Sequence, residues 1–220
     1  NASRGNGTGS TYGSGNFEAP SGVRDAINGT STFTLEVFIN LEDSSGGTKS
    51  IMGLGGGQED GAWAFGVASN SSGLGARSLF FQYARTGGTW GDNSLTNVNS
   101  GYEIEVGKDY YVAFSFNALD ETGAGAIFYI KNLTDDTAME TITVTRSAAA
   151  ATDPFDTSYD FTLGNSITAA PFKGVIDNAR ISDVQLDVPD LLISNIPETS
   201  SAHWLGIALS LWSSLPPKSS

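Results

Sequence analysis

The chain has 220 residues, of which 39% are hydrophobic, and a formal net charge of −13. A phosphate-binding surface needs clustered Lys and Arg residues, and this sequence has no such cluster, so nucleic acid is excluded as a partner. The absence of cysteine excludes disulfides and thiolate metal sites. The 27 glycines and the charged fraction of only 16% indicate many short strands joined by tight turns.

The first 16 residues are mainly Gly, Ser and Asn, a composition typical of a flexible arm. From residue 33 onward, apolar residues recur at every second position in short segments that Gly-rich stretches separate. The segment 33–40 shows this best, because Phe, Leu, Val and Ile share one of its faces. The sequence predicts strands at 33–40, 51–54, 62–67, 79–83, 110–116, 126–131, 141–145, 161–164 and 172–182. Residues 183–192 are expected to form a short turn or helix.

Strands at this spacing, with no long amphipathic helix between them, favour two packed antiparallel sheets over β-α-β units. An all-β chain of this length commonly stays a single domain. The sequence therefore predicts an all-β fold, a two-sheet antiparallel β-sandwich, at residues 17–193. The arm at 1–16 precedes this domain, and an apolar C-terminal tail at 194–220 follows it.

Four segments, in the right order, resemble the laminin-G-like family of concanavalin A-like jelly rolls. Residues 33–40 are similar to the opening inner strand of that family, and residues 107–117 resemble its Gly-Gln-Trp-Tyr-His-Val-Ala stretch. Residues 128–132 and 163–182 are similar to a neighbouring strand and to the ending of the domain. The resemblance covers roughly residues 20–192 and is specific for fold rather than for function. It implies that the last strand pairs with the first strand of the sandwich.

The closing strand carries the most informative part of this resemblance. Gly174 precedes its alternating residues, Asp177 lies inside it and Arg180 lies near its end. Two positions depart from the family pattern: Asp109 stands where the family has Trp, and the Gly-rich stretch around Gly56 is unusually long.

The resemblance implies a secreted or cell-surface protein that binds rather than catalyses. The leading hypothesis is an adhesive or carbohydrate-binding module whose partner is a polysaccharide or another glycan. The alternative is a structural subunit of an extracellular filament or matrix, in which the arm and the tail dock on neighbouring copies of the chain.

Catalysis is not expected, because the residues that it would need are missing. The only histidine, His203, lies in the tail, so the sandwich contains neither an imidazole base nor a Ser-His-Asp triad. A glycosidase needs two carboxylates that face one cleft. The nearest approach is Glu103 and Glu105, which precede a Gly-Lys turn and are expected to lie on a solvated edge.

A sugar-binding site needs an aromatic face for stacking and nearby amides and carboxylates for the hydroxyls. Trp90, Asp92 and Asn93 offer this set within one Gly-rich loop, where a Trp is hard to bury. Tyr83 and Trp63 either line the same region or belong to the core. For Trp90 the competing interpretation is packing within its own loop.

The resemblance also implies a structural calcium ion, which takes six to eight oxygen ligands. In many proteins of this kind the Asp of the closing strand holds calcium against the first strand. That position is Asp177 here, and Glu18 or Asp25 would complete the site from the N-terminal side. The alternative is that Asp177 is an exposed strand residue or accepts a hydrogen bond in a turn.

Residues 196–212 resemble the PEP-CTERM sorting tails of biofilm-forming Gram-negative bacteria. Pro197 and Glu198 match the motif, whereas Thr199 replaces its second Pro, and Lys218 is the only basic residue near the end. The apolar run is shorter than the roughly 20 residues that span a bilayer. This tail would give a transient membrane contact and an extracellular or cell-surface location. The alternative is a tail that packs on its own domain or on a neighbour.

Overall fold

The computed structural model describes residues 29–55, 62–84, 95–146, 161–165 and 170–195, with residues 3–5, 17–18 and 95 described by their backbone alone. The strands belong to one compact unit, 1–187, and residues 188–220 form a second unit. In the part of the second unit that is described, two short 3₁₀ helices, η3 (Val188–Asp190) and η4 (Leu192–Asn195), follow each other. The tail beyond residue 195, including its sorting-signal resemblance, lies outside the described residues.

The first layer, called sheet A, is antiparallel throughout and has the order β1-β13-β3-β8-β9-β10. The closing strand β13 pairs with β3, the first long strand, as the sequence predicted. Part of the expected arm also joins this sheet, because the backbone of β1 pairs with β13 of the same chain. The strands are β1 (Ser3–Gly5), β3 (Thr32–Leu41), β8 (Asp109–Asn117), β9 (Ala126–Asn132), β10 (Glu140–Thr143) and β13 (Gly174–Ser182).

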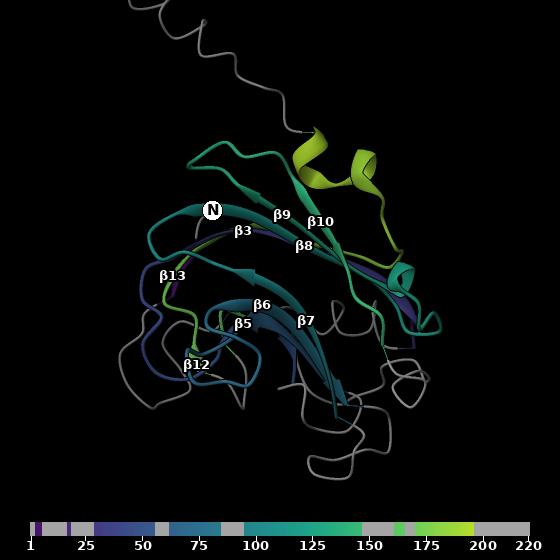
Figure 1. Cartoon of the computed structure of the whole chain (residues 1–220), viewed down its shortest axis with the longest axis horizontal. Helices are drawn as coiled ribbons and strands as arrows, with labels where there is room; N and C mark the ends of the chain where they lie inside the picture. Colours follow the sequence, from purple (N-terminus) through teal and green to yellow (C-terminus); the bar gives the residue numbers. More distant parts are fainter. Residues whose placement is uncertain are drawn as a thin grey trace, which may run out of the picture. The chain divides into compact units, whose positions relative to one another are not determined.

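The second layer, sheet B, has the order β2-β11-β4-β5-β6-β7, and β12 pairs in parallel with β4. Figure 1 shows β5, β6 and β7 side by side in this layer, with β3, β8, β9 and β10 in the other. The strands are β2 (Phe17–Glu18), β4 (Lys49–Leu54), β5 (Trp63–Val67), β6 (Ser78–Ala84), β7 (Leu95–Glu103), β11 (Phe161–Leu163) and β12 (Ala170–Pro171).

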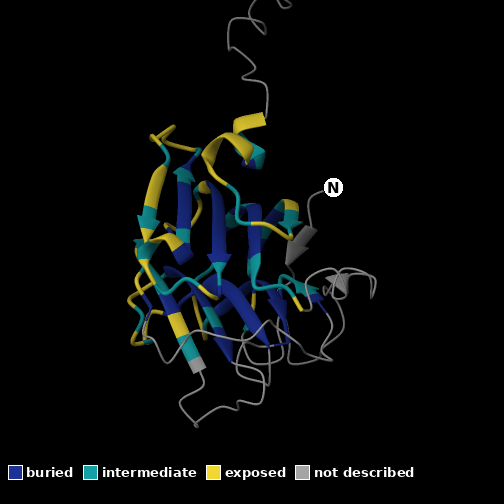
Figure 2. Ribbon diagram, turned by 90° about the vertical axis from the view of Figure 1, so that its right-hand side faces the viewer, coloured by how far each residue is buried: buried dark blue, intermediate teal, exposed yellow. Residues whose placement is uncertain are grey.

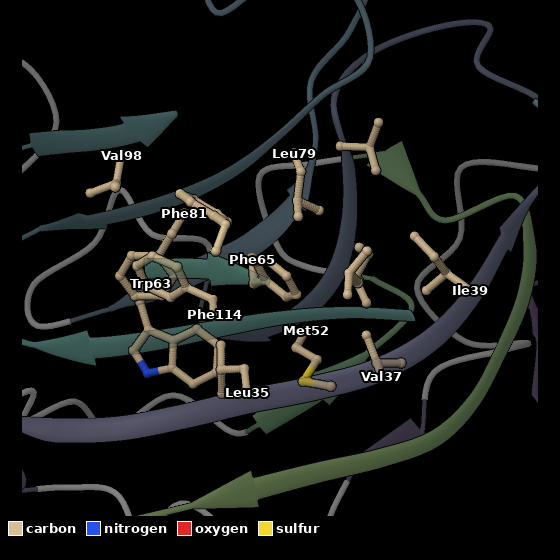
Figure 3. Packing of buried hydrophobic residues seen from close by; sticks show 14 of the residues in the cluster. Leu35, Val37, Ile39, Met52, Trp63, Phe65, Leu79, Phe81, Val98 and Phe114 are labelled. Atoms are coloured by element: carbon tan, nitrogen blue, oxygen red, sulfur yellow. The ribbon is translucent and has the colours of Figure 1, made fainter. Parts of the chain in front are cut away.

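The core consists of the inward-facing apolar side chains of both sheets, which alternate with outward-facing residues along each strand. Figure 2 shows the buried residues running along the strands, and Figure 3 shows the aromatic centre of the core. Phe81 of sheet B stacks on Phe114 of sheet A with ring centroids 4.5 Å apart, and Trp63 stacks on Phe33 at 5.6 Å. Each buried aromatic side chain contributes about 1.5–3 kcal/mol through the removal of its surface from water. This packing confirms the predicted β-sandwich.

A β-bulge interrupts the closing strand, and the sequence pattern did not reveal it. Ile176 lies opposite Ile39 and Ile181 lies opposite Leu35, so both face the core although an odd number of positions separates them. A regular strand would send one of them to the outer face. The pairing shifts by one residue between Asp177 and Arg180, which restores the correct face.

The bulge also brings Arg180 opposite Glu36 on the outer face of sheet A. Glu36 is fully buried and forms an ion pair with Arg180. The Tyr111 hydroxyl donates a hydrogen bond to Glu36 Oε1 over 2.6 Å. This network explains why an Arg stands near the end of the closing strand: its charge compensates a carboxylate that water does not reach.

Among the described residues, no helix combines the length and the apolar character that crossing a membrane would require.

Candidate functional site

The candidate site lies at one end of sheet B, where two connections leave the sheet. Leu54, Trp63 and Tyr83 lie in register on β4, β5 and β6, and Ala84 lies opposite Leu95 on β7. The connections β4–β5 and β6–β7 therefore start and finish at this same end, called here the β6–β7 end. Trp90, Asp92 and Asn93 belong to the β6–β7 connection and lie outside the described residues.

Tyr83 belongs to the core at this end. Only 3% of its surface is exposed, and its ring lies 5.4 Å from that of Phe116 and 5.8 Å from that of Phe81. Its hydroxyl accepts a hydrogen bond from Arg146 Nη1 over 3.0 Å. Trp63 is also buried, with 1% of its surface exposed. Of the two roles considered from the sequence, lining the Trp90 region or belonging to the core, both residues therefore take the core role. A buried ring offers no face for a sugar to stack on.

Arg146 joins the two sheets at this end. Its guanidinium lies 4.6 Å from the centre of the Phe116 ring, a cation–π contact. Its Nη2 donates to the carbonyl oxygens of Asn117, at 2.6 Å, and of Asp120. With the bond to Tyr83 of sheet B, these contacts fix the β6–β7 end against the end of strand β8.

Two amide side chains lie on the outer face of sheet B next to this end. Gln82 stands between the core residues Phe81 and Tyr83, so its side chain points to the opposite face. Asn97 lies directly opposite Gln82 on β7 and is exposed. Gln82 Nε2 donates a hydrogen bond to Asn97 Oδ1 over 2.6 Å. This pair thus presents uncharged donors and acceptors beside the connection that carries Trp90.

This pair could not be predicted from the sequence, because the pattern of residues 95–103 does not indicate a strand. The alternation around Gln82 is enough to place that residue on the outer face. Among the β7 side chains that the structure describes, two pack into the core, buried Val98 and half-buried Tyr102, and the others are mainly polar. The sequence of β7 therefore resembles a loop, and Asn97 could not be assigned to any sheet face.

Asn99, the next outward-facing amide of β7, is used inside the protein. Its Oδ1 accepts hydrogen bonds from Ser78 and, over 3.1 Å, from the backbone N–H of Gly101. Its Nδ2 donates to the carbonyl oxygen of Leu74. Asn99 therefore holds the β5–β6 connection against β7, and Gln82 and Asn97 make up the amide pair that is left to face a ligand.

The three residues expected to bind calcium are described to different extents. Asp177 is half-buried on β13, and its Oδ1 accepts a hydrogen bond from the N–H of Asn178 over 2.9 Å. Glu18 is described by its backbone, which pairs with Thr162 in sheet B, whereas Asp177 belongs to sheet A. Asp25 lies outside the described residues. Among side chains that the structure describes, no three acidic, His or Cys residues gather as a metal site would require, so the calcium site stays a prediction.

The acidic residues considered for catalysis are both paired with cations. Glu103 forms an ion pair with Arg77, and Glu105 Oε2 lies 3.1 Å from Lys108 Nζ. Lys108 Nζ also contacts Asp135 Oδ2 at 2.6 Å, and these two carboxylates raise the pKa of Lys108 above its ordinary value. This arrangement agrees with a solvated edge rather than a pair of carboxylates that face one cleft.

Residues 11–191 match the family described as the concanavalin A-like lectin/glucanases superfamily. Among solved structures, the CBM40 of the Ruminococcus gnavus IT-sialidase, bound to α2,3-sialyllactose, is 11% identical with a TM-score of 0.59. That alignment covers 88% of this chain and 96% of the CBM40 chain. None of the curated protein sequences matches the chain.

A second similar structure is the full-length tailspike protein 2 of Escherichia coli O157:H7 bacteriophage CAB120, at 13% identity and a TM-score of 0.53. The alignment covers 76% of this chain but 22% of the tailspike, so the chain spans about a fifth of that protein's length. At these identities the two likenesses show a shared fold.

Proposed function

Because the chain belongs to the concanavalin A-like lectin/glucanases superfamily, we propose that it is a non-catalytic carbohydrate-binding module of a secreted or cell-surface protein, with a role in adhesion. The observation that carries this proposal is the outward-facing amide pair of half-buried Gln82 and exposed Asn97 beside the β6–β7 connection. The CBM40 structure with bound sialyllactose supports the ligand class, since its fold covers nearly the whole of this chain.

The chemistry of the β6–β7 end suits a sugar. Trp90 supplies an aromatic face for the C–H groups of a pyranose ring, and Asp92 and Asn93 supply polar atoms for hydroxyls. The strands on either side of this connection place Gln82 and Asn97 next to it. Amide side chains both donate and accept hydrogen bonds, as sugar hydroxyls do.

The distribution of acids and bases supports binding without turnover. Glu103 and Glu105, the closest approach to a catalytic carboxylate pair in the sequence, are each engaged with a cation. The only histidine of the sequence is His203, in the C-terminal tail. General acid–base catalysis of glycoside cleavage would need a free carboxyl pair across a cleft.

The alternative of a filament or matrix subunit relies on the arm docking to a neighbouring copy. The backbone of Ser3–Gly5 instead pairs with Gly174, Val175 and Ile176 of the same chain. Since this part of the arm has an intramolecular partner, the binding module is the better supported proposal.

Glycan-array binding of the purified chain tests the proposal. We expect retention on at least one polysaccharide or oligosaccharide, and loss of that retention in Trp90→Ala because the stacking platform is removed. Val106→Ala is the matched control, since Val106 is 44% exposed and lies in the β7–β8 connection, at the opposite end of β7 from the site. An array without signal for the unmodified chain would refute the function, and equal binding by both variants would refute the role of Trp90.

We also propose that calcium stabilises the closing strand through Asp177, with Glu18 or Asp25 as further ligands. Added calcium should raise the melting temperature, a chelator should lower it, and Asp177→Asn should remove the response. Asp136→Asn is the control, because Asp136 is a highly exposed carboxylate whose partner is Lys131. A melting temperature indifferent to both calcium and chelator would rule the site out.

A further inference from the structure

The segment that follows the closing strand lies against the outer face of sheet A. Residues 183–187, called here the strap, form hydrogen bonds with three side chains from neighbouring strands: Thr34 of β3, Ser115 of β8 and Tyr129 of β9. Each of these residues stands between two core residues of its strand, so its side chain points to the outer face. They are buried nonetheless, with exposed fractions of 0%, 0% and 3%.

The three hydroxyls bind the backbone of the strap. The N–H of Leu186 donates to Thr34 Oγ1 over 2.9 Å, and Thr34 Oγ1 donates to the carbonyl oxygen of Val184 over 2.8 Å. Ser115 Oγ and the Tyr129 hydroxyl both donate to the carbonyl oxygen of Leu186, over 3.3 and 3.4 Å. Both polar backbone groups of Leu186 are therefore satisfied by side chains of sheet A.

Little else holds the strap in place. Gln185 Nε2 donates to the carbonyl oxygen of Ala124 over 2.6 Å, and Thr32 Oγ1 donates to that of Asp183 over 3.4 Å. Among the described residues, no backbone–backbone hydrogen bond involves the strap. Val184 is 48% exposed, and no residue of the strap belongs to the hydrophobic core. The strap is thus attached to the sandwich mainly through side-chain hydroxyls.

The strand that precedes the strap is held in a different way. β13 pairs with β3 from Gly174 to Ser182, and Ile176 and Ile181 of this strand pack in the core. Segments with few buried apolar contacts open at a lower free energy than the body of a domain. The contrast between β13 and the strap therefore predicts that the strap opens first.

We propose that the strap is a lid on sheet A: it opens while the β-sandwich stays folded, and its opening exposes the hydroxyls of Thr34, Ser115 and Tyr129 to solvent. In the closed form these hydroxyls are occupied by the backbone of the strap, which keeps them from any other ligand. The lid lies on sheet A, so this inference goes beyond the glycan site proposed on sheet B and does not depend on it.

Thiol labelling tests the proposal, because the chain contains no cysteine and a single introduced thiol is therefore a specific reporter. Ser115→Cys puts a thiol of similar size under the strap, and Val112→Cys puts one into the core from the same strand. Iodoacetamide should modify the Ser115→Cys chain at least about tenfold faster under native conditions, since only the strap has to open. Equal labelling rates would overturn the lid.

Urea separates the two kinds of opening even if the two variants differ in stability. Labelling of Ser115→Cys should depend weakly on urea, whereas labelling of Val112→Cys should rise with the slope of global unfolding, because this slope scales with the surface exposed. A slope for Ser115→Cys as steep as that for Val112→Cys would show that the strap opens only when the sandwich unfolds.

A second substitution assigns the closed form to the hydroxyls. Thr34→Val, combined with Ser115→Cys, removes a hydroxyl that makes two bonds to the strap, and labelling should accelerate about tenfold. Thr141→Val is the matched control, because Thr141 lies opposite Tyr129 on β10, is exposed and makes no hydrogen bond within the described residues. This control should leave labelling unchanged. Unchanged labelling with Thr34→Val would overturn the role of the hydroxyls.

A core substitution in sheet B completes the test. Ile51→Val on β4 shortens a fully buried side chain and destabilises the sandwich as a whole. It should accelerate labelling of Val112→Cys about fivefold and leave that of Ser115→Cys within about twofold, because the strap opens from an intact sandwich. Equal acceleration of both thiols would contradict separate opening. None of these measurements uses a glycan, so their failure and the failure of the proposed function are distinct results.

Discussion

Gly174 is a residue at which the fold does not tolerate a side chain. A Cβ atom at this position would lie 1.9 Å from the carbonyl oxygen of Asn40 on the paired strand β3. Gly174 and Asn40 belong to the paired strands β13 and β3, so neither backbone segment can move away without breaking the pairing. Gly174→Ala should therefore destabilise the protein by more than about 2 kcal/mol.

Chemical denaturation measures this effect, and Gly73→Ala serves as its control. A Cβ at Gly73 meets no atom within 4 Å, so that variant should keep its stability within about 0.5 kcal/mol. Equal stability of the two variants would show that the closing strand does not approach β3 as closely as described.

The Glu36–Arg180 pair provides a second test on single side chains. Arg180→Ala would leave the fully buried carboxylate of Glu36 without its cation, which should cost about 3–5 kcal/mol. Lys131→Ala removes a pair whose acid, Asp136, is 88% exposed, and should cost at most about 1 kcal/mol. Urea unfolding of both variants measures these costs. Similar small losses in the free energy of unfolding would mean that Glu36 is not a buried carboxylate that needs the charge of Arg180.

Among the strands, the bulge in β13 depends on Asn178. This residue has a φ of 48°, in the left-handed region where Asn is tolerated and β-branched residues are not. Asn178→Val should therefore lower the free energy of unfolding by about 1–2 kcal/mol, whereas Asn178→Gly should leave it nearly unchanged. Destabilisation by Gly that equals the effect of Val would contradict a bulge centred on this residue.

The long strands could be predicted because one of their faces is buried. The alternating residues of 33–40 and 110–116 lie within β3 and β8, and both segments are confirmed as neighbours in sheet A. Periodicity alone could not reveal the bulge, because the one-residue shift in pairing shows only against β3. The expected turn after the closing strand corresponds to η3 and η4, where hydrogen bonds are local.

The Trp90 site stays a prediction, because Trp90 was chosen for its Gly-rich surroundings and lies outside the described residues. Its connection leaves the end of sheet B beside an amide pair. The role of Tyr83 was left open because alternation identifies the inner face of a strand but not how far each of its side chains is buried. Asn97 required the pairing of β6 with β7, which depends on contacts between distant residues and not on local pattern.

For the molecule as a whole, the ion pairs predict how stability depends on pH. The Lys173 ammonium, 2.7 Å from Asp43 Oδ2, and Ser45 hold the pKa of Asp43 well below its ordinary 3.8. Lys108 lowers the pKa of Asp135 in the same way. Because these pKa values are lower in the folded state, the carboxylates stabilise the fold above about pH 4, and this contribution disappears as the pH falls through the folded-state pKa.

Asp43→Asn tests this dependence in urea unfolding over a range of pH. The variant should be less stable than the unmodified chain at about pH 7, and the difference should shrink as the pH falls below about 4, where Asp43 is protonated in the unfolded state but keeps its charge longer in the folded state. A difference that stays constant over this range would show that Asp43 acts through packing and not through its charge.

The central claim, that a glycan binds at the β6–β7 end of sheet B, is tested most directly by NMR titration of the side-chain amide signals. With a glycan selected on the array, we expect the NH₂ signals of Gln82 and Asn97 to shift in proportion to occupancy. The signal of Asn70, an exposed amide in the β5–β6 connection at the other end of sheet B, should stay in place. Shifts confined to the outer face of sheet A, around Phe38 and Lys131, with Gln82 and Asn97 unmoved, would contradict it.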